Sequence, residues 1–201
     1  MTAIKICGIT RAEDAAAAVS LGVNALGFVL WPSSPRHTTT AAAAAIIRDL
    51  PPFVTPVGVF VDPSADEIAA AADAGLRIAQ VHGAVPSGLL RLPVLRAVHL
   101  SAADPDAIEP AVADATVLLD AHDPVRHGGT GRTVDWTRAR AIAARRRIVL
   151  AGGLTPLNVD AAIATVRPYA VDVASGVETE PGIKDSLKLR AFINAVRGTG
   201  N

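Results

Sequence analysis

Short apolar runs, bounded by glycine, proline and polar residues, recur along this chain of 201 residues, and stretches with helical spacing separate them. Apolar runs of this length predict β-strands, and their alternation with helical stretches predicts an α/β fold. The predicted strands are residues 4–9, 25–30, 56–61, 78–82, 94–100, 116–121, 148–152 and 170–175. The predicted helices are residues 11–21, 39–50, 64–74, a short and weak one around 86–92, then 102–113, 134–146, 156–166 and 185–197.

An internal repeat supports this alternation. Residues 14–30, 67–83 and 160–176 each contain an alanine-rich helix, a Gly or Pro break and a short apolar strand. Eight strand–helix units in about 200 residues predict a single (β/α)8 TIM-barrel domain over residues 1–201, whereas an open doubly wound sheet would suit five or six strands better. The two longest predicted loops, 31–38 and 122–133, both follow strands, which places them at the catalytic end of a barrel.

Two predicted helices carry capping signals where they begin. Ser64-Ala65-Asp66-Glu67 has the spacing of a capping box, in which the Ser and Glu side chains satisfy free backbone N–H groups. Thr155-Pro156 combines a capping residue with proline at the first helical position.

Composition narrows the class of protein. Lys plus Arg and Asp plus Glu both number 19, without the basic excess that a nucleic-acid or membrane-surface protein normally carries. A lone cysteine cannot form an intramolecular disulfide, which favours a reducing compartment. No apolar run approaches the roughly 20 residues of a membrane span, and a strand begins too early for a signal sequence. We therefore expect a cytoplasmic protein that binds neither nucleic acid nor membrane.

Strand alternation places polar side chains on one face of the predicted strands. Lys5 and Cys7 are in phase on the first strand, and Gln80 and His82 are in phase on the fourth. The other polar strand residues are Arg96, Asp120 and Asp172. Buried charges need partners, and the two cations in this set can pair with its two carboxylates inside a barrel. Because the first and last strands become neighbours when a barrel closes, we predict a contact between Lys5 and Asp172.

Two glycine-containing loops predict an anion site. Ala151-Gly152-Gly153-Leu154 follows the seventh strand, and Ser175-Gly176-Val177-Glu178 follows the eighth. Adjacent glycines let backbone N–H groups approach an anion, and the loops after strands seven and eight form a frequent phosphate site of barrels. The residues expected to bind phosphate are Gly152, Gly153, Ser175 and Gly176.

Several single residues near the predicted catalytic end allow two interpretations. A lone cysteine such as Cys7 is more often a core residue than a reactive one. Arg36, in a loop stiffened by prolines, could bind a carboxylate with two hydrogen bonds or could be a solvated surface residue. Asp120 either begins a solvated loop or acts as a general acid. His82 could be a base, although a hydrogen-bonded structural histidine is more frequent, and the five histidines show no metal-ligand spacing.

A series of motifs runs through the chain in order. They are KICGIT (5–10), ALGFV (25–29), SPR (34–36), LPPFVTPVGVFVD (50–62), QVHG (80–83), LLDA (118–121), GGTGRTVDW (128–136), LAGGLTPLNV (150–159), RPYAVDVASGVE (167–178) and PGIKD (181–185). With them the sequence resembles the phosphoribosylanthranilate isomerase family over essentially its whole length. KICGIT, GGTG with DW, and VDVASGVE are far more specific than the features of a generic barrel.

The resemblance implies an aldose–ketose isomerase of tryptophan biosynthesis. Its reaction would be the Amadori rearrangement of N-(5-phosphoribosyl)anthranilate to 1-(2-carboxyphenylamino)-1-deoxyribulose 5-phosphate. In the family the acid is the aspartate that ends strand six, here Asp120, and the base is the cysteine of KICG, here Cys7 as thiolate. We expect Lys5 and Arg96 to lower the pKa of this thiol.

The resemblance also implies how the substrate is held. Arg36 matches the residue that contacts the anthranilate carboxylate, and the glycine-containing loops match the phosphate-binding positions. Gln80, His82 and Asp172 complete the expected substrate-binding set. Proton transfers of this kind need no metal or organic cofactor.

Three departures from the family pattern affect loops. Val134 stands where the family usually has an aromatic residue, Ala84-Val85 replaces acidic residues, and His37 is often tyrosine. None of them is a proposed acid, base or phosphate residue.

Two other functions stay open. A related or dual-substrate sugar-phosphate isomerase of histidine synthesis would use an aspartate at the end of strand one, where this chain has Cys7. A non-catalytic barrel that binds a phosphorylated ligand would lack the acid or the base. The low aromatic content, 3%, offers no obvious interface, so we expect a monomer rather than a homodimer.

Overall fold

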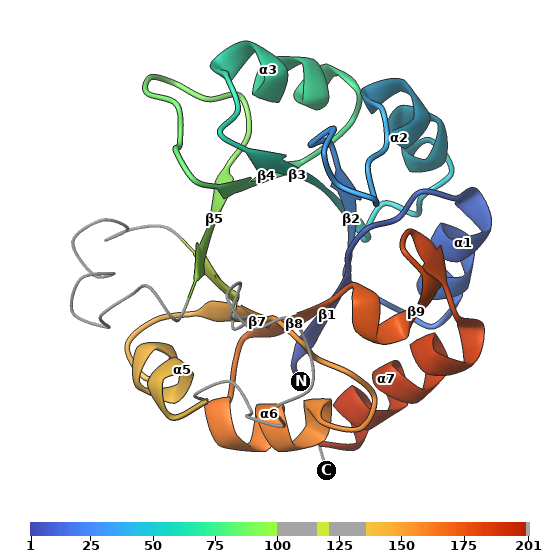
Figure 1. The fold of residues 1–201 in the computed structure, drawn as a ribbon, viewed down its shortest axis with the longest axis vertical. Coiled ribbons are helices and arrows are strands. Elements are labelled where there is room, and N and C mark those ends of the chain that lie inside the picture. Colours follow the sequence, from blue (N-terminus) through green and yellow to red (C-terminus); the bar gives the residue numbers. More distant parts are fainter. Residues whose placement is uncertain (100–115, 121–135, 200–201) are drawn as a thin grey trace.

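A computed structural model describes residues 1–99, 116–120 and 136–199, and its eight parallel strands form a closed barrel (Figure 1). The strands follow one another around the ring in chain order, and β1 pairs with β8 to close it. They are β1 (Ala3–Ile6), β2 (Ala25–Val29), β3 (Thr55–Val61), β4 (Ile78–His82), β5 (Val94–His99), β6 (Val117–Asp120), β7 (Ile148–Ala151) and β8 (Ala170–Val173). The predicted (β/α)8 barrel is confirmed.

The described helices surround the ring (Figure 1). They are α1 (Ala12–Ser20), α2 (Thr40–Ile47), α3 (Ala65–Asp73), α5 (Trp136–Ala143), α6 (Val159–Val166) and α7 (Ser186–Gly198). Between β8 and α7 lie a 3-10 turn, η1 (Ser175–Val177), and a small antiparallel ribbon of β9 (Glu178–Glu180) and β10 (Ile183–Lys184). Within the described ranges, no helix is both long and apolar enough to span a membrane.

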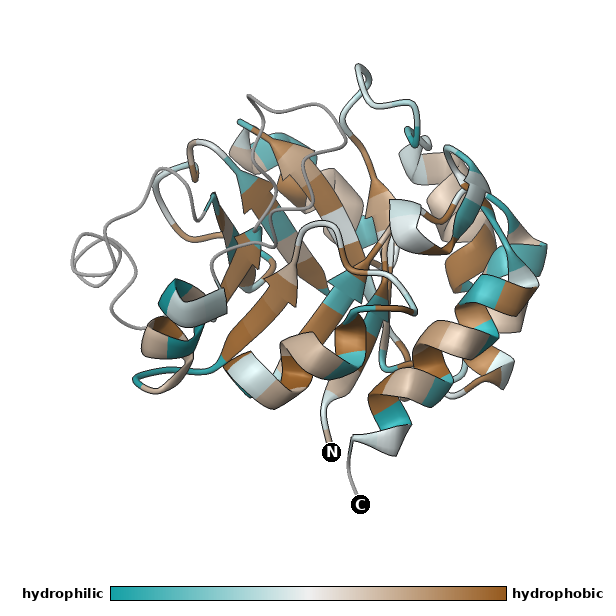
Figure 2. Cartoon of the chain, turned by 60° about the horizontal axis from the view of Figure 1, so that its bottom comes forward, coloured by the Kyte–Doolittle hydropathy of each residue, from teal (hydrophilic) through white to brown (hydrophobic). Residues whose placement is uncertain are grey.

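Two apolar layers stabilise the barrel. One strand phase faces the helices, and its side chains share one buried cluster with theirs, which includes Phe28 of β2, Leu119 of β6 and Phe192 of α7. The other phase fills the interior with two further buried clusters, which contain Leu95, Ala97, Leu118, Val149, Ala151 and Ala170, and Cys7, Val29 and Val59. The strands are mostly hydrophobic along their length (Figure 2), and burial of this surface drives the fold.

Two of the predicted boundaries that the structure corrects lie beside polar residues at the strand ends. β1 ends at Ile6, so Cys7 is the first residue beyond the strand, and its N–H donates to the Val173 carbonyl at 2.8 Å. The helix start predicted at Thr155-Pro156 is wrong, because α6 begins at Val159. The side chain of Asn158 accepts from the Thr155 N–H at 2.7 Å and donates to the Gly153 carbonyl at 3.0 Å, which holds a turn in place of the first helical turn.

Two further predictions concern where helices begin and whether they form. The capping box of α3 is confirmed: the Glu67 N–H donates to Ser64 Oγ, and the Ser64 N–H donates to the Glu67 carboxylate. The weak helix around 86–92 is wrong, since residues 83–93 form only bends and irregular structure. The predicted helix 102–113, the loop 122–133 and Val134 lie outside the described residues.

Candidate active site

A buried ion pair links the two strands that close the barrel. Lys5 of β1 lies opposite Asp172 of β8, and Lys5 Nζ is 3.0 Å from Asp172 Oδ1. The two side chains are only 5% and 7% exposed. The predicted contact is confirmed, and each charge meets the compensation that burial demands.

The glycine at position 27 brings this ion pair next to the thiol. A Cβ atom at Gly27 of β2 would lie 2.8 Å from Cys7 Sγ and 3.0 Å from Lys5 Nζ. The Lys5 ammonium and the Cys7 sulfur therefore both lie against the backbone of Gly27, in the space that a side chain at this position would fill. Lys5 pairs with Asp172 and adjoins Cys7 at the same time.

The surroundings of Cys7 set its acidity. Burial is the largest influence and raises the pKa of the Cys7 thiol; the charge of Lys5 comes next and lowers it. Asp172 raises the pKa further and Lys184 lowers it, and the outcome is a raised pKa. Lys5 thus acts in the expected direction, but burial outweighs it. Burial alone would lower the pKa of Lys5, yet Asp172 and then Cys7 outweigh burial, so the Lys5 ammonium keeps its charge.

Arg96 does not belong to the barrel interior, contrary to the expectation from the sequence. Its neighbours Leu95 and Ala97 belong to the interior layer, so Arg96 lies in the opposite strand phase. The interior residue at the end of β5 is His99, which sequence reasoning missed. Its ring centroid lies 6.1 Å from that of His82, and it stands opposite Asp120 in the strand register.

Gln80 and His82 line the interior on β4, as their phase predicted. Gln80 Nε2 lies 3.1 Å from His82 Nε2, close enough for a hydrogen bond between the amide and the ring. Burial lowers the pKa of His82, with the charge of Asp120 opposing it, so the ring is neutral near pH 7. Gln80 is 3% exposed, and its Oε1 has no hydrogen-bond partner among the described residues. Such a buried acceptor is suited to a polar group of a ligand.

Arg36 stands above Cys7 on the loop after β2. Its Nε and Nη2 donate to the Glu178 carboxylate over 2.6–3.0 Å. A Cβ at Gly8 would meet Arg36 Cδ at 2.7 Å, so the arginine side chain crosses directly over the residue after Cys7. One edge of the guanidinium is therefore engaged by Glu178, and only Nη1 and the outer side of Nη2 can meet a ligand.

The two glycine-containing loops touch each other beyond β7 and β8. Gly152 and Gly153 adopt φ of 89° and 66°, values in the left-handed region that glycine tolerates best. A Cβ at Gly176 would overlap the Leu154 carbonyl oxygen, so the loops pack backbone to backbone. A Cβ at Gly153 would meet nothing within 4 Å. The loops thus expose peptide groups beside open space, as an anion site requires.

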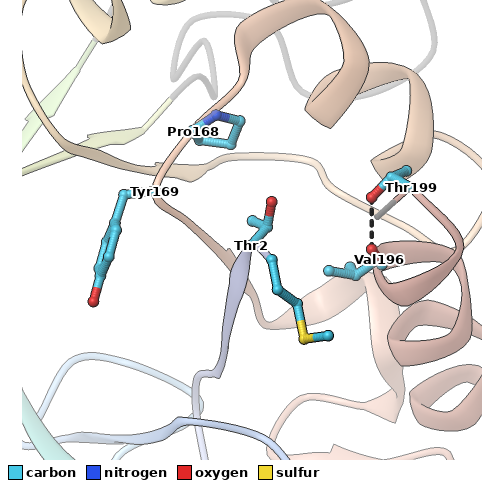
Figure 3. Close-up of a pocket in the computed structure, with 6 residues that line it drawn as sticks. Thr2, Pro168, Tyr169, Val196 and Thr199 are labelled. Atoms are coloured by element: carbon cyan, nitrogen blue, oxygen red, sulfur yellow. Dashed lines mark hydrogen bonds between the residues drawn. The ribbon is translucent and has the colours of Figure 1, made fainter. Parts of the chain in front are cut away.

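A hollow at the other end of the barrel is separate from this site. Its volume is about 230 Å³, and it is lined by Met1, Thr2, Pro168, Tyr169, Val196 and Thr199 (Figure 3). These residues precede β1 and β8 or end α7, on the side where both termini lie (Figure 2). It is remote in the fold from the strand ends that carry the polar residues.

A family model, named relatives and solved structures that resemble this chain point to one enzyme family. Residues 4–195 match the family model described as N-(5'phosphoribosyl)anthranilate (PRA) isomerase. A Geobacter sp. (strain M21) protein named N-(5'-phosphoribosyl)anthranilate isomerase is 50% identical over 197 residues, which cover 96% of this chain and 97% of that protein. The crystal structure of phosphoribosyl anthranilate isomerase from Thermotoga maritima superimposes with a TM-score of 0.86 at 40% identity and covers 98% of this chain and 100% of that one. A structure of such an isomerase with reduced 1-(o-carboxyphenylamino)-1-deoxyribulose 5-phosphate has a TM-score of 0.83 at 37% identity, with the same coverage of 98% and 100%.

Proposed function

The chain belongs to the N-(5'-phosphoribosyl)anthranilate isomerase family, and we propose that it isomerises N-(5-phosphoribosyl)anthranilate to 1-(2-carboxyphenylamino)-1-deoxyribulose 5-phosphate in tryptophan biosynthesis. The observation that carries this proposal is the placement of Cys7 beside the Lys5 ammonium, at the barrel end where Asp120 and the glycine-containing loops also lie. These groups can supply a base, an acid and a phosphate site for one sugar phosphate.

The first chemical step opens the furanose ring. The Asp120 carboxyl group donates a proton to the ring oxygen, and the bond between C1′ and that oxygen breaks. The lone pair of the anilino nitrogen forms the C1′=N bond of a Schiff base. Asp120 is left as a carboxylate.

The second step moves a proton from carbon. The Cys7 thiolate removes the proton from C2′, and the electron pair passes into the C1′–C2′ bond and onto the nitrogen. The resulting enol tautomerises to the C2′ ketone of the product. A thiolate whose pKa is raised is a stronger base than an ordinary one, and the Lys5 ammonium stabilises its charge. Each step is a proton transfer that these side chains can carry.

Substrate contacts follow from the same geometry. The phosphate would accept hydrogen bonds from Gly152, Gly153, Ser175 and Gly176. The anthranilate carboxylate would meet the free edge of Arg36. Gln80, His82 and Asp172, which line the interior, would contact the sugar.

The histidine-synthesis isomerase is less well supported, because Cys7 takes the place of the aspartate expected at the end of strand one. We further propose that the protein is a cytoplasmic monomer, as its free cysteine and low aromatic content favour.

Genetic complementation tests the proposed function. Expression in a bacterial strain deleted for this isomerase should restore growth without tryptophan, and a strain deleted for the histidine-pathway isomerase should stay auxotrophic. The Cys7→Ala variant, matched in expression level, should restore neither. Rescue by Cys7→Ala as good as by the wild type would remove Cys7 from its proposed role, and failure of the wild type would contradict the function.

A further inference from the structure

A buried charged cluster lies beneath Arg36 and takes no part in the proton transfers. Lys184 of β10 has a fully buried side chain, and the Glu178 side chain of β9 is 4% exposed. Lys184 Nζ lies 2.7 Å from Glu178 Oε1. Removing two charged groups from water costs free energy, which a solvated ion pair does not pay. The contacts of the two side chains show which parts of the site this buried pair supports.

Lys184 holds the backbone at Cys7. Its Nζ donates to the Cys7 carbonyl at 2.6 Å and lies 3.4 Å from the Ala174 carbonyl. These two carbonyls belong to the first residues beyond β1 and β8. The Lys184 N–H donates to the Asp14 carboxylate of α1 at 3.0 Å, which anchors the lysine from behind. A single ammonium therefore joins the two strand ends that flank the thiol.

Glu178 holds the guanidinium of Arg36. The carboxylate accepts from Arg36 on one side, from Lys184 on the other, and from the Gly182 N–H at 3.2 Å. With these donors the Glu178 carboxylate cannot turn without breaking several hydrogen bonds. Among the described residues Nη1 of Arg36 has no partner, so Glu178 fixes the guanidinium from behind and leaves its outer edge for a ligand.

The charges do not cancel within the cluster. Arg36 and Lys184 carry two positive charges, and Glu178 supplies one negative charge. The Asp14 carboxylate behind Lys184 is balanced by Arg11, whose Nη2 lies 2.7 Å from Asp14 Oδ1. Burial raises the pKa of Glu178, but the hydrogen bonds and charges of Arg36 and Lys184 outweigh it, so the pKa is lowered and the group stays ionised. One net positive charge remains close to Cys7, which is also a place where a substrate carboxylate gains stability.

We propose that Lys184 and Glu178 are positioning residues for the isomerase site: Lys184 fixes Cys7 through its backbone carbonyl and holds a cation close to the thiol, and Glu178 orients Arg36 toward the substrate carboxylate. This rests on the roles proposed above for Cys7 and Arg36. The two residues act on different events, since Lys184 acts on the base and Glu178 on the binding of substrate. The proposal therefore predicts that their loss separates kcat from KM.

The role proposed for Lys184 is tested by titrating Cys7, the only cysteine of the chain. The ultraviolet absorbance of the thiolate is titrated in the full-length wild type and in Lys184→Gln, each as a difference from the same protein with Cys7→Ser. Loss of the nearby cation should raise the Cys7 pKa, and kcat should fall about tenfold or more while KM changes less. The double variant E178Q/K184Q serves if Lys184→Gln does not fold, because it removes the buried carboxylate together with its ammonium. It also removes the cation that acts on Cys7, so the Cys7 pKa should still rise, by less than in Lys184→Gln.

A matched control is Arg197→Met. Arg197 also joins distant segments by donating to backbone carbonyls, those of Leu21 and Gly22, but it does so at the opposite end of α7. The Arg197→Met variant should therefore have the same Cys7 pKa as the wild type. An unchanged Cys7 pKa in folded Lys184→Gln, or an equal shift in Arg197→Met, would overturn the role of Lys184.

A double-mutant cycle tests the Glu178 half. Glu178→Gln should raise KM, and the dissociation constant of the reduced product analogue, about tenfold while Arg36 is present. In an Arg36→Ala background the same change should add little, because Glu178 acts through Arg36. Equal effects in both backgrounds would overturn its role. The thiolate titration and the binding of the analogue require no turnover. If the wild type had no isomerase activity, the proposed function would be refuted, and these two measurements would still decide the roles of Lys184 and Glu178.

Discussion

Lys5 and Asp172 meet across the one strand pair that closes the barrel, and their 3.0 Å ion pair holds an ammonium against the sulfur of Cys7. The contact therefore has two effects. It compensates two buried charges at the seam between the first and last strands, and it fixes the cation that favours the thiolate.

Asp172→Asn should destabilise the protein strongly. The change leaves the Lys5 ammonium buried without a counter-charge, and breaking a buried pair from one side costs about 3–5 kcal/mol. Urea unfolding followed by circular dichroism measures the change. The exposed pair between Arg91 and Asp73 provides the control, since Asp73→Asn should cost less than about 1 kcal/mol. Equal losses in the two variants would contradict the structural importance of the buried pair.

Gly27→Ala should reduce activity by displacing two groups at once. The added methyl would lie 2.8 Å from Cys7 Sγ and 3.0 Å from Lys5 Nζ, so both must move. Displacement of about 1 Å at a reacting group lowers kcat by about 100-fold. The matched control is Gly198→Ala in the last turn of α7, where a new Cβ meets nothing within 4 Å. Steady-state kinetics should show normal turnover for Gly198→Ala. Normal turnover for Gly27→Ala as well would contradict the prediction, because it would show that Cys7 and Lys5 tolerate displacement.

The ionisation of Cys7 should lie at higher pH than that of an ordinary thiol. Because burial raises its pKa, the thiolate fraction at pH 7 is small and should grow through a midpoint above that of an ordinary thiol. Lys5 opposes this rise, so Lys5→Met should move the midpoint still higher. Alkylation of the sole cysteine by iodoacetamide, measured against pH, reports this titration. A midpoint at or below that of an ordinary thiol in the wild type would mean that the cations outweigh burial.

Asp120→Asn should abolish most of the ring-opening step. An amide of the same size cannot donate the carboxyl proton, and loss of a general acid lowers turnover about 10²–10⁴-fold. The unfolding midpoint should stay near that of the wild type, because Asp120 is only half-buried at the end of β6. Near-normal kcat in this variant would place the acid elsewhere.

Strand phase predicted the Lys5–Asp172 contact but failed for Arg96, and the reason is physical. In β1 and β8 the polar residues interrupt otherwise apolar strands at neighbouring register positions, so the closure of the barrel places them together. β5 is apolar on both faces, since Leu95 and Ala97 fill the interior while Val94 and Val98 pack outward. A single arginine does not reveal which face of β5 is interior, and the polar residue on the interior face is His99 at the strand end.

The cluster beneath Arg36 could not be found from periodicity at all. Glu178 and Lys184 lie in a ribbon that follows the last barrel strand, where no alternation relates them to Cys7. The bidentate geometry predicted for Arg36 was also incomplete, because the sequence gives no sign that Glu178 takes one edge of the guanidinium. Contacts between segments about 140 to 180 residues apart depend on the closed barrel and not on local pattern.

The most direct test of the account is a fluorescence assay with freshly prepared N-(5-phosphoribosyl)anthranilate. The substrate signal should disappear far faster with the purified protein than in an uncatalysed control, and Cys7→Ala should reduce this rate by orders of magnitude while it remains folded. A signal identical to the uncatalysed control would contradict the proposed isomerase function.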